Sequence, residues 1–276
     1  MDPIYIAGWM KDYQEHRFPF VPGIDLSGVV ERLGAGVGGF AAGDEVYGVV
    51  ARPYVGEGTY AEFAIVGADS IAPKPASLTH EEAASVPHAG LTALAAVDAA
   101  ELQAGQVVAV VGATGGVGSF VTQLAALRGA TVIAVTSPDG AAQALEYGAT
   151  ATVDYSTGDV SVKLLAAHPG GIDALIDLHS DGDVLEQYAT AVRADGVVVS
   201  PRGPAASAAP ALEARGVRFV GANRAPATRL PEITALFDAG KLRVPPIKVY
   251  PLDQAPAALA EMAAGHVRGK LVISIA

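Results

Sequence analysis

The sequence predicts an α/β protein in which a doubly wound parallel sheet is joined to a smaller β module. Three observations lead to this prediction. Short strand patterns separated by glycine turns occupy residues 1–90, strand and helix patterns alternate from 91 to 224, and one strand pattern closes the chain after two further helices. The closing strand does not continue the alternation. We therefore expect residues 225–276 to return to the first module and to make that domain discontinuous.

Composition limits the classes of protein that the chain can represent. Of 276 residues, 51% are hydrophobic and 17% charged, which is enough to bury a large core. The formal net charge of -11 disfavours nucleic acid and anionic membrane surfaces as partners. The sequence has no long apolar span and no secretory leader pattern, and cysteine is absent. These features predict a soluble, cytoplasmic protein without disulfides.

The first module is patterned for short antiparallel strands. Runs at 28–33, 45–50 and 60–66 are rich in β-branched or aromatic residues, and a glycine-dense turn separates the first two. Thr79 and Glu82 have the spacing of a capping box, which predicts the start of a helix. Short strands joined by glycine turns indicate a small barrel-like fold.

The alternating part predicts a parallel sheet covered on both faces by helices. The predicted strands are 107–111, 131–135, 152–155, 174–178, 197–200 and 217–221. Helices are predicted at 92–100, 120–127, 138–147 and 185–192, with another ending at 163–167. After residue 225, helices at 232–239 and 255–263 precede the closing strand at 270–275.

A glycine-rich loop follows the first of these parallel strands. Its spacing is Ala113-x-Gly115-x-x-Gly118, so alanine replaces the first glycine of the G-x-G-x-x-G pattern. Residues without Cβ let the backbone turn sharply and approach a pyrophosphate, whose charge then lies on the free amides of a helix N-terminus. Strand, loop, helix and strand occur in the right order within about thirty residues. We therefore predict a dinucleotide site, the alternative being a glycine-rich turn without a ligand.

Taken together, these motifs resemble the medium-chain dehydrogenases/reductases, and most closely their zinc-independent quinone oxidoreductase branch. The resemblance is carried by the phrases at 20–30, 43–48, 58–63, 90–93, 112–118 and 269–272. It implies a GroES-like domain at 1–90 and 225–276, packed on a Rossmann domain at 91–224, with NADPH bound between them. Members of the family have several strands before an Asn-Pro-Ile-Asp-like phrase. Here Asp2 stands in the asparagine position, so the GroES-like domain is expected to be truncated at its front edge. Three explanations stay open: the start is misassigned, the missing strands are dispensable, or a sheet edge is left open.

We do not expect a metal site. Zinc-dependent relatives hold the metal with Cys, His and Glu, whereas this chain has no Cys and its histidines are scattered singly. His88 and His179 fall where the family lines its cofactor cleft. The six histidines are His16, His80, His88, His168, His179 and His266.

The cofactor prediction is NADPH, with NADH the less favoured alternative. Thr136 and Ser137 end the second strand without the carboxylate that would hold a ribose 2′-hydroxyl, and they leave room for a 2′-phosphate. Against this, Asp139 follows closely and no Lys or Arg occurs between Arg128 and Lys163. With the residues that the resemblance adds, the predicted cofactor-binding set is Thr92, Ala113, Thr114, Gly115, Gly116, Val117, Gly118, Thr136, Ser137, Tyr155, Leu178, Ser200, Arg202 and Lys270. Within this set, Tyr155 is expected against the adenosine phosphate and Thr92 near the nicotinamide-side phosphates.

The predicted reaction is hydride transfer to a quinone or an α,β-unsaturated carbonyl, whose conjugation carries the developing charge. No side chain is assigned as catalytic. Asp2, Tyr5, Trp9 and Tyr54 are the predicted substrate-pocket residues. Two alternatives stay open: an enoyl-thioester reductase of the same superfamily, and a catalytically silent nucleotide-binding protein. The resemblance also implies a homodimer, with 217–223 as the sheet edge through which it forms.

Overall fold

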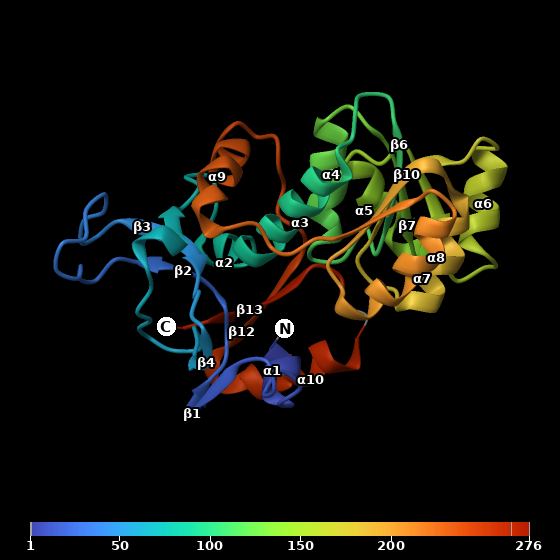
Figure 1. The fold of residues 1–276 in the computed structure, drawn as a ribbon. Coiled ribbons are helices and arrows are strands. Elements are labelled where there is room, and N and C mark those ends of the chain that lie inside the picture. Colours follow the sequence, from blue (N-terminus) through green and yellow to red (C-terminus); the bar gives the residue numbers. More distant parts are fainter. Residues whose placement is uncertain (1, 266, 276) are drawn as a thin grey trace. The chain divides into compact units, whose positions relative to one another are not determined.

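The computed structural model describes residues 2–265 and 267–275, and its chain divides into two compact units (Figure 1). Unit 1 consists of Met1–Leu91 and Pro226–Ala276, and unit 2 consists of Thr92–Ala225. Helix α3 (Pro87–Ala100) contains the boundary between them. None of the described helices is long and apolar enough to cross a membrane.

Unit 2 is built on a six-stranded, wholly parallel sheet with the order β11-β10-β9-β6-β7-β8. Its strands are β6 (Val107–Val111), β7 (Thr131–Thr136), β8 (Ala151–Asp154), β9 (Ile172–Asp177), β10 (Val192–Ser200) and β11 (Arg218–Gly221). The three central strands are almost completely buried, as continuous runs of Val, Ile, Leu and Ala require in a sheet covered on both faces.

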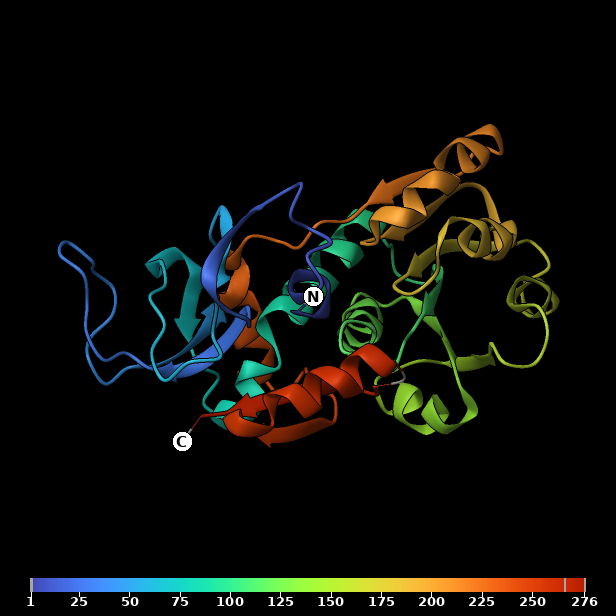
Figure 2. The ribbon, with the colours of Figure 1, turned by 90° about the horizontal axis from the view of Figure 1, so that it is seen from below.

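Helices pack on both faces of this sheet (Figure 2). They are α4 (Gly118–Leu127), α5 (Ala141–Glu146), α6 (Val160–Ala167), α7 (Gly182–Tyr188) and α8 (Ala209–Ala214), with 3-10 helices η2 (Pro138–Gly140), η3 (Ala189–Ala191) and η4 (Gly203–Ala208). One core cluster joins strand residues such as Ile133 and Leu175 to helix residues such as Leu164, Leu185 and Leu212. The doubly wound parallel sheet predicted from the sequence is therefore confirmed.

The described residues of unit 1 form three small sheets. An antiparallel sheet has the order β2 (Asp25–Val29), β3 (Glu45–Val49) and β5 (Ile71–Pro73), and two parallel pairs join β1 (Glu15–Val21) to β4 (Tyr54–Glu57) and β12 (Ile247–Pro251) to β13 (Lys270–Ser274). The helices of unit 1 are α1 (Asp2–Ile6), α2 (His80–Ala84), α9 (Leu230–Asp238) and α10 (Ala255–Ala264), with 3-10 helices η1 (Ala68–Ser70), η5 (Ala227–Arg229) and η6 (Leu252–Gln254).

The C-terminal segment returns to the first module, as the sequence predicts. The hydroxyl of Tyr47 on β3, a fully buried residue, donates to the carbonyl of Leu230 at 3.1 Å and lies 2.9 Å from the Thr234 hydroxyl on α9. Lys270 on β13 pairs with Asp25 on β2 at 3.4 Å. The discontinuous domain is thus joined through side chains far apart in the sequence.

Three details of the first module differ from the sequence prediction. The predicted strand at 60–66 does not form, because no described strand pairs with it, and Phe63 and Ile65 are 72% and 82% exposed. The strand predicted at 28–33 lies instead at Asp25–Val29, the stretch that pairs with β3. Strands β1 and β4 were not predicted. The capping box does form, since Glu82 N donates to Thr79 Oγ1 at 3.2 Å and Thr79 N donates to the Glu82 carboxylate at 2.9 Å.

Candidate functional site

The sheet of unit 2 reverses its direction of growth between β6 and β9. From β6 the chain moves outward through β7 and β8, and from β9 it moves outward on the other side through β10 and β11. Ligands of open α/β sheets bind at such a switch point, outside the carboxyl ends of the strands. The glycine loop at 112–117 lies there, because Val111 at the end of β6 is in register with Asp177 at the end of β9.

The turn from β6 into α4 requires glycine at two positions. Gly112 has a φ of +75°, a conformation that residues with a side chain rarely adopt. A Cβ on Gly118 would lie 2.0 Å from the carbonyl oxygen of Gly112, so any larger residue would displace the backbone. Ala113 is fully buried, and its side chain packs inside the unit. The spacing of the motif therefore reflects the close approach of the helix start to the strand end.

The start of α4 offers backbone donors to an anion. Among the residues that the structure describes, the amides of Gly116 and Val117 have no acceptor, and both residues are only half-buried. The amide of Ser119, two residues further along, is already engaged, because it donates to Gly115 O at 2.9 Å. Free amides and the positive end of the helix dipole favour a phosphate group. The amides of Gly116 and Val117 at the start of α4 therefore fit a dinucleotide pyrophosphate.

Two threonine hydroxyls close the end of β7 against the glycine loop. Thr114 Oγ1 and Thr136 Oγ1 are 3.0 Å apart, and both residues are buried. A Cβ on Gly140 would lie 2.4 Å from the Thr136 hydroxyl, so η2 packs directly on this pair. Thr136 thus positions the loop. The next residue, Ser137, is half-buried and keeps part of its surface exposed at this strand end.

A cation that the sequence did not point to lies beside the end of β7. Thr136 is in register with Asp154, the last residue of β8. The ammonium of Lys163, on α6, donates to the Asp154 carbonyl at 2.6 Å and to Thr157 Oγ1 at 2.9 Å. The Asp154 carboxylate accepts from Ser156 and Thr157, and the hydrogen bonds from Ser156 hold its pKa below the ordinary value. Lys163 could not be assigned from spacing, because only the β7–β8 register brings it here.

Tyr155 follows β8 at the same edge and is 49% exposed. It directly precedes the hydrogen-bonded turn at 156–157, which also accepts from Lys163. The structure thus places Thr114, Thr136, Ser137 and Tyr155 at the ends of three neighbouring strands, β6, β7 and β8.

A buried carboxylate, which the sequence analysis did not single out, holds the segment after β9. Asp177 is fully buried, and its Oδ1 accepts from His179 N at 2.9 Å and from Ser180 N at 2.8 Å. Its Oδ2 has no partner among the described residues. Leu178 N donates to Val111 O at 3.3 Å, which places Leu178 beside Gly112. Asp177 therefore fixes the loop that faces the glycine turn, while the His179 side chain is exposed.

The end of β10 carries Ser200 and Arg202. Ser200 is buried, and its hydroxyl accepts from Arg202 N at 3.2 Å. The Arg202 guanidinium pairs with Asp181 at 2.9 Å, with side chains 40% and 72% exposed. An exposed pair of this kind is weak, so Arg202 is free to exchange Asp181 for a phosphate at little cost. Thr92 is buried in α3.

In unit 1 the predicted residue Lys270 belongs to a polar cluster around Asp25. The Asp25 carboxylate accepts from His88 N at 2.6 Å and from Lys270 Nζ at 3.4 Å. The Asp2 carboxylate accepts from the amide of Gly23 at 3.1 Å, and Gly23 lies two residues before Asp25 in the chain. Burial, and then the charges of Asp2 and Asp25, raise the pKa of the neighbouring Tyr60. The cluster therefore makes ionisation of Tyr60 less favourable than in an exposed tyrosine.

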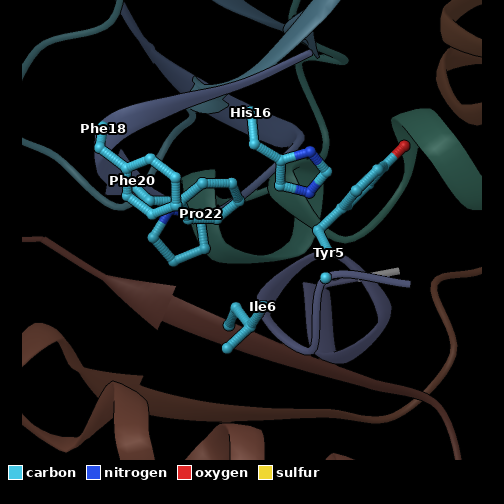
Figure 3. Close-up of a pocket in the computed structure, with 7 residues that line it drawn as sticks. Tyr5, Ile6, His16, Phe18, Phe20 and Pro22 are labelled. Atoms are coloured by element: carbon cyan, nitrogen blue, oxygen red, sulfur yellow. The ribbon is translucent and has the colours of Figure 1, made fainter. Parts of the chain in front are cut away.

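The four predicted substrate-pocket residues are not brought together. Tyr5 lines an aromatic cavity (Figure 3), whereas Asp2 binds Gly23 and Trp9 is 74% exposed. The Arg17 guanidinium carbon lies 3.4 Å from the centre of the Tyr54 ring, and the Tyr54 hydroxyl donates to the Glu57 carboxylate at 2.9 Å. Tyr54 is therefore engaged in a surface contact of the β1–β4 pair.

The described part of the chain contains no group of three or more His, Asp or Glu side chains that could hold a metal ion. His80 lies 2.8 Å from the Ser27 hydroxyl and 3.2 Å from Glu45, and Ser27 donates to Val46 O. His168 ends α6, and His266 lies outside the described residues.

These features define a two-unit protein with a dinucleotide-binding fold, and known proteins of that kind are similar to it. The family model of the alcohol dehydrogenase GroES-like domain matches residues 2–76, and the model named zinc-binding dehydrogenase matches 147–273. The chain is 32% identical to the mitochondrial NAD(P)H oxidoreductase RTN4IP1 of Homo sapiens, over 99% of this chain and 74% of that protein. It is 31% identical to 2-methylene-furan-3-one reductase of Solanum lycopersicum, over 92% of this chain and 63% of that protein.

A solved structure is similar to this fold over nearly the whole chain. The quinone oxidoreductase from Coxiella burnetii superposes with a TM-score of 0.86 at 33% identity, covering 99% of this chain and 83% of that one. The chain belongs to the medium-chain dehydrogenase/reductase superfamily, in its zinc-independent, quinone oxidoreductase-like branch. It is an oxidoreductase of that superfamily, and its relatives indicate a nicotinamide cofactor.

Proposed function

We propose that this protein uses NADPH to reduce a quinone or an α,β-unsaturated carbonyl. The observation that carries the proposal is the loop at the switch point, where Gly118 lets the start of α4 pack against the end of β6 and the amides of Gly116 and Val117 have no acceptor among the described residues. The similar proteins support the acceptor class, since they include a quinone oxidoreductase and a 2-methylene-furan-3-one reductase.

The end of β7 supports NADPH over NADH. Thr136 and Ser137 supply no carboxylate for a ribose 2′-hydroxyl, and the ammonium of Lys163 lies on the neighbouring strand end. An ammonium has three donors, of which Lys163 uses two within the described chain. The third remains for a 2′-phosphate. Tyr155, Arg202 and Lys270 are the further side chains that we assign to the cofactor.

The bound cofactor would supply the hydride, and the residues of this chain would bind, orient and exclude water. Gly112 and Gly118 fix the loop against the strand, and Asp177 holds the facing segment through two backbone amides. In unit 1, the Asp25–Lys270 pair and Asp2 surround Tyr60, whose pKa is raised first by burial and then by the two carboxylates.

Titration of the purified protein with NADPH and NADH, followed by addition of a quinone or an enone, tests the proposal. The expected result is tighter binding of NADPH and its oxidation on addition of an acceptor. Binding without oxidation by any acceptor would support a silent nucleotide-binding protein. Absence of binding to either cofactor would overturn the proposal.

We further propose a homodimer formed through β11. This strand is an edge of the six-stranded sheet, and its outer side has no partner strand in the described chain. An open edge favours pairing with a second copy. Analytical ultracentrifugation should give twice the monomer mass, and a proline at Phe219 should reduce it to the monomer.

A further inference from the structure

We infer that residues 62–66 form a self-complementary edge strand through which two copies of this chain pair reversibly. The segment lies in unit 1 between β4 and η1, and none of the described strands pairs with it. Its large apolar residues, Phe63 and Ile65, alternate with Glu62, Ala64 and Val66. The segment contributes nothing to the glycine loop or to the predicted cofactor set, so the inference goes beyond the proposed function.

Both faces of this segment are open to solvent. Phe63 and Ile65 are 72% and 82% exposed, and the intervening Ala64 and the preceding Glu62 are exposed as well. Successive side chains of a strand point to opposite faces, so exposure of four residues in a row leaves neither face packed on unit 1. The segment thus presents two large apolar side chains, on one face, to a partner.

The backbone of the segment is available for pairing. The amides of residues 62–66 have no acceptor among the described residues, and Arg52 Nη2 donates to the carbonyl of Ile65 at 2.8 Å. Backbone groups of alternate residues point to opposite edges of a strand, so Arg52 covers the edge that Ile65 faces and leaves the edge that Ala64 faces. Unpaired donors and acceptors along such an edge hydrogen-bond to a strand of another chain.

The partner that fits is a second copy, because the segment is complementary to itself. In an antiparallel pair with its two-fold axis at Ala64, the two Ala64 residues form a hydrogen-bonded pair, and Phe63 of each copy faces Ile65 of the other. Two contacts between an aromatic and a β-branched side chain then stabilise one face. The same register places Glu62 opposite Val66, so the carboxylates of the two copies do not meet. An interface this short makes a transient dimer.

The experiment uses single cysteines, since the chain has none of its own. The register places the two Ala64 Cα atoms about 5.5 Å apart, within reach of a disulfide, whereas the two Ala68 Cα atoms would be roughly 26 Å apart along the strands. We expect Ala64→Cys to form a disulfide-linked dimer under mild oxidation at least about tenfold faster than Ala68→Cys, which is also an exposed position. Alkylation rates of the two thiols correct for their accessibility.

Two double variants separate this contact from other causes. Phe63→Ser combined with Ala64→Cys removes both cross-strand contacts and should reduce the rate to that of Ala68→Cys. Phe219→Pro combined with Ala64→Cys alters the β11 edge alone and should retain the fast rate. Equal corrected rates at positions 64 and 68, or a rate that Phe63→Ser leaves unchanged, would overturn the inference. Loss of the fast rate with Phe219→Pro would also overturn it, because the contact would then depend on β11.

The unaltered protein supplies a second measurement that needs no variant. Pairing protects the amide of Ala64 from hydrogen exchange, so its exchange should slow as the protein concentration rises from micromolar to millimolar. An exchange rate for Ala64 that does not depend on protein concentration would overturn the inference even if a cysteine variant failed to fold.

Discussion

Replacing Lys163 with glutamine should lower the affinity for NADPH and leave that for NADH unchanged. The ribose 2′ position is read at the end of the second strand of the βαβ unit, here Thr136 at the end of β7. Neighbouring strands are about 4.8 Å apart, and the Lys163 ammonium is 2.6 Å from the carbonyl of Asp154, which is in register with Thr136. The cation therefore lies within roughly 10 Å of the Thr136 backbone, at the strand end where the two cofactors are distinguished.

The magnitude follows from the group that is lost. A hydrogen bond to a charged group is worth about 1.5–3 kcal/mol, which corresponds to a change of about 10-fold to 150-fold in Kd. Lys163 is half-buried, so solvent should keep the effect nearer the lower figure. The assay is fluorescence or calorimetric titration of the purified protein with NADPH and NADH. It needs no acceptor and no turnover.

Controls separate recognition from structure. Lys163→Arg keeps the charge and should retain most of the preference for NADPH. Lys241→Gln removes an exposed lysine of unit 1 and tests whether the loss of one positive charge anywhere on the protein lowers the affinity for NADPH. Equal weakening of both cofactors by Lys163→Gln would mean that the lysine only holds the Asp154–Thr157 turn. An unchanged NADPH affinity would refute the assignment altogether.

Two further predictions concern the loop and the sheet. Gly118→Ala should weaken the binding of NADPH and of NADH alike by more than about tenfold and destabilise the fold by about 1–3 kcal/mol, because its Cβ would lie 2.0 Å from the Gly112 carbonyl oxygen. Titration and a thermal melt measure the two effects. Gly203→Ala is the control, because a Cβ there meets nothing within 4 Å. The pKa of Asp173 is lowered: burial acts to raise it, but hydrogen bonds from Val107 N at 2.7 Å and Arg193 at 2.9 Å outweigh burial. A lowered folded pKa means that this carboxylate stabilises the fold above the ordinary Asp value of about 3.9, and that the stability is lost as pH falls through the lower folded pKa. Urea midpoints at pH 7 and about pH 3 should therefore differ less in Asp173→Asn than in the unaltered protein, and equal differences would contradict the assignment.

The parallel sheet was predictable because each strand carries its own signal. The runs at Val107–Val111 and Ile172–Asp177 are continuous and apolar, as strands buried on both faces must be. The run at 60–66 shows why similar reasoning failed in the first module. Its alternating residues are typical of a strand, but strand formation needs a partner, and none of the described strands provides one.

The candidate site divides in the same way. The glycine loop was predicted because its residues are contiguous and its physical requirement, the absence of Cβ, is written in the residue type. Lys163 was not predicted, because it is separated from Thr136 by 27 positions in the numbering and meets it only across two paired strands. Asp177 was also missed, since nothing in its neighbourhood distinguishes a carboxylate that holds two amides from one on the surface.

By itself the sequence determined the alternation of strands and helices, the glycine-rich loop and the family resemblance, since each depends on residues close together in the chain. Only the tertiary structure decided which strand ends meet, that Lys163 stands beside the end of β7, and that Thr136 is paired with Thr114. It also decided that Tyr5, His16 and Phe20 line one cavity. The physical reason is that hydrogen bonds and packing between distant segments depend on strand order and register, which local patterns do not encode.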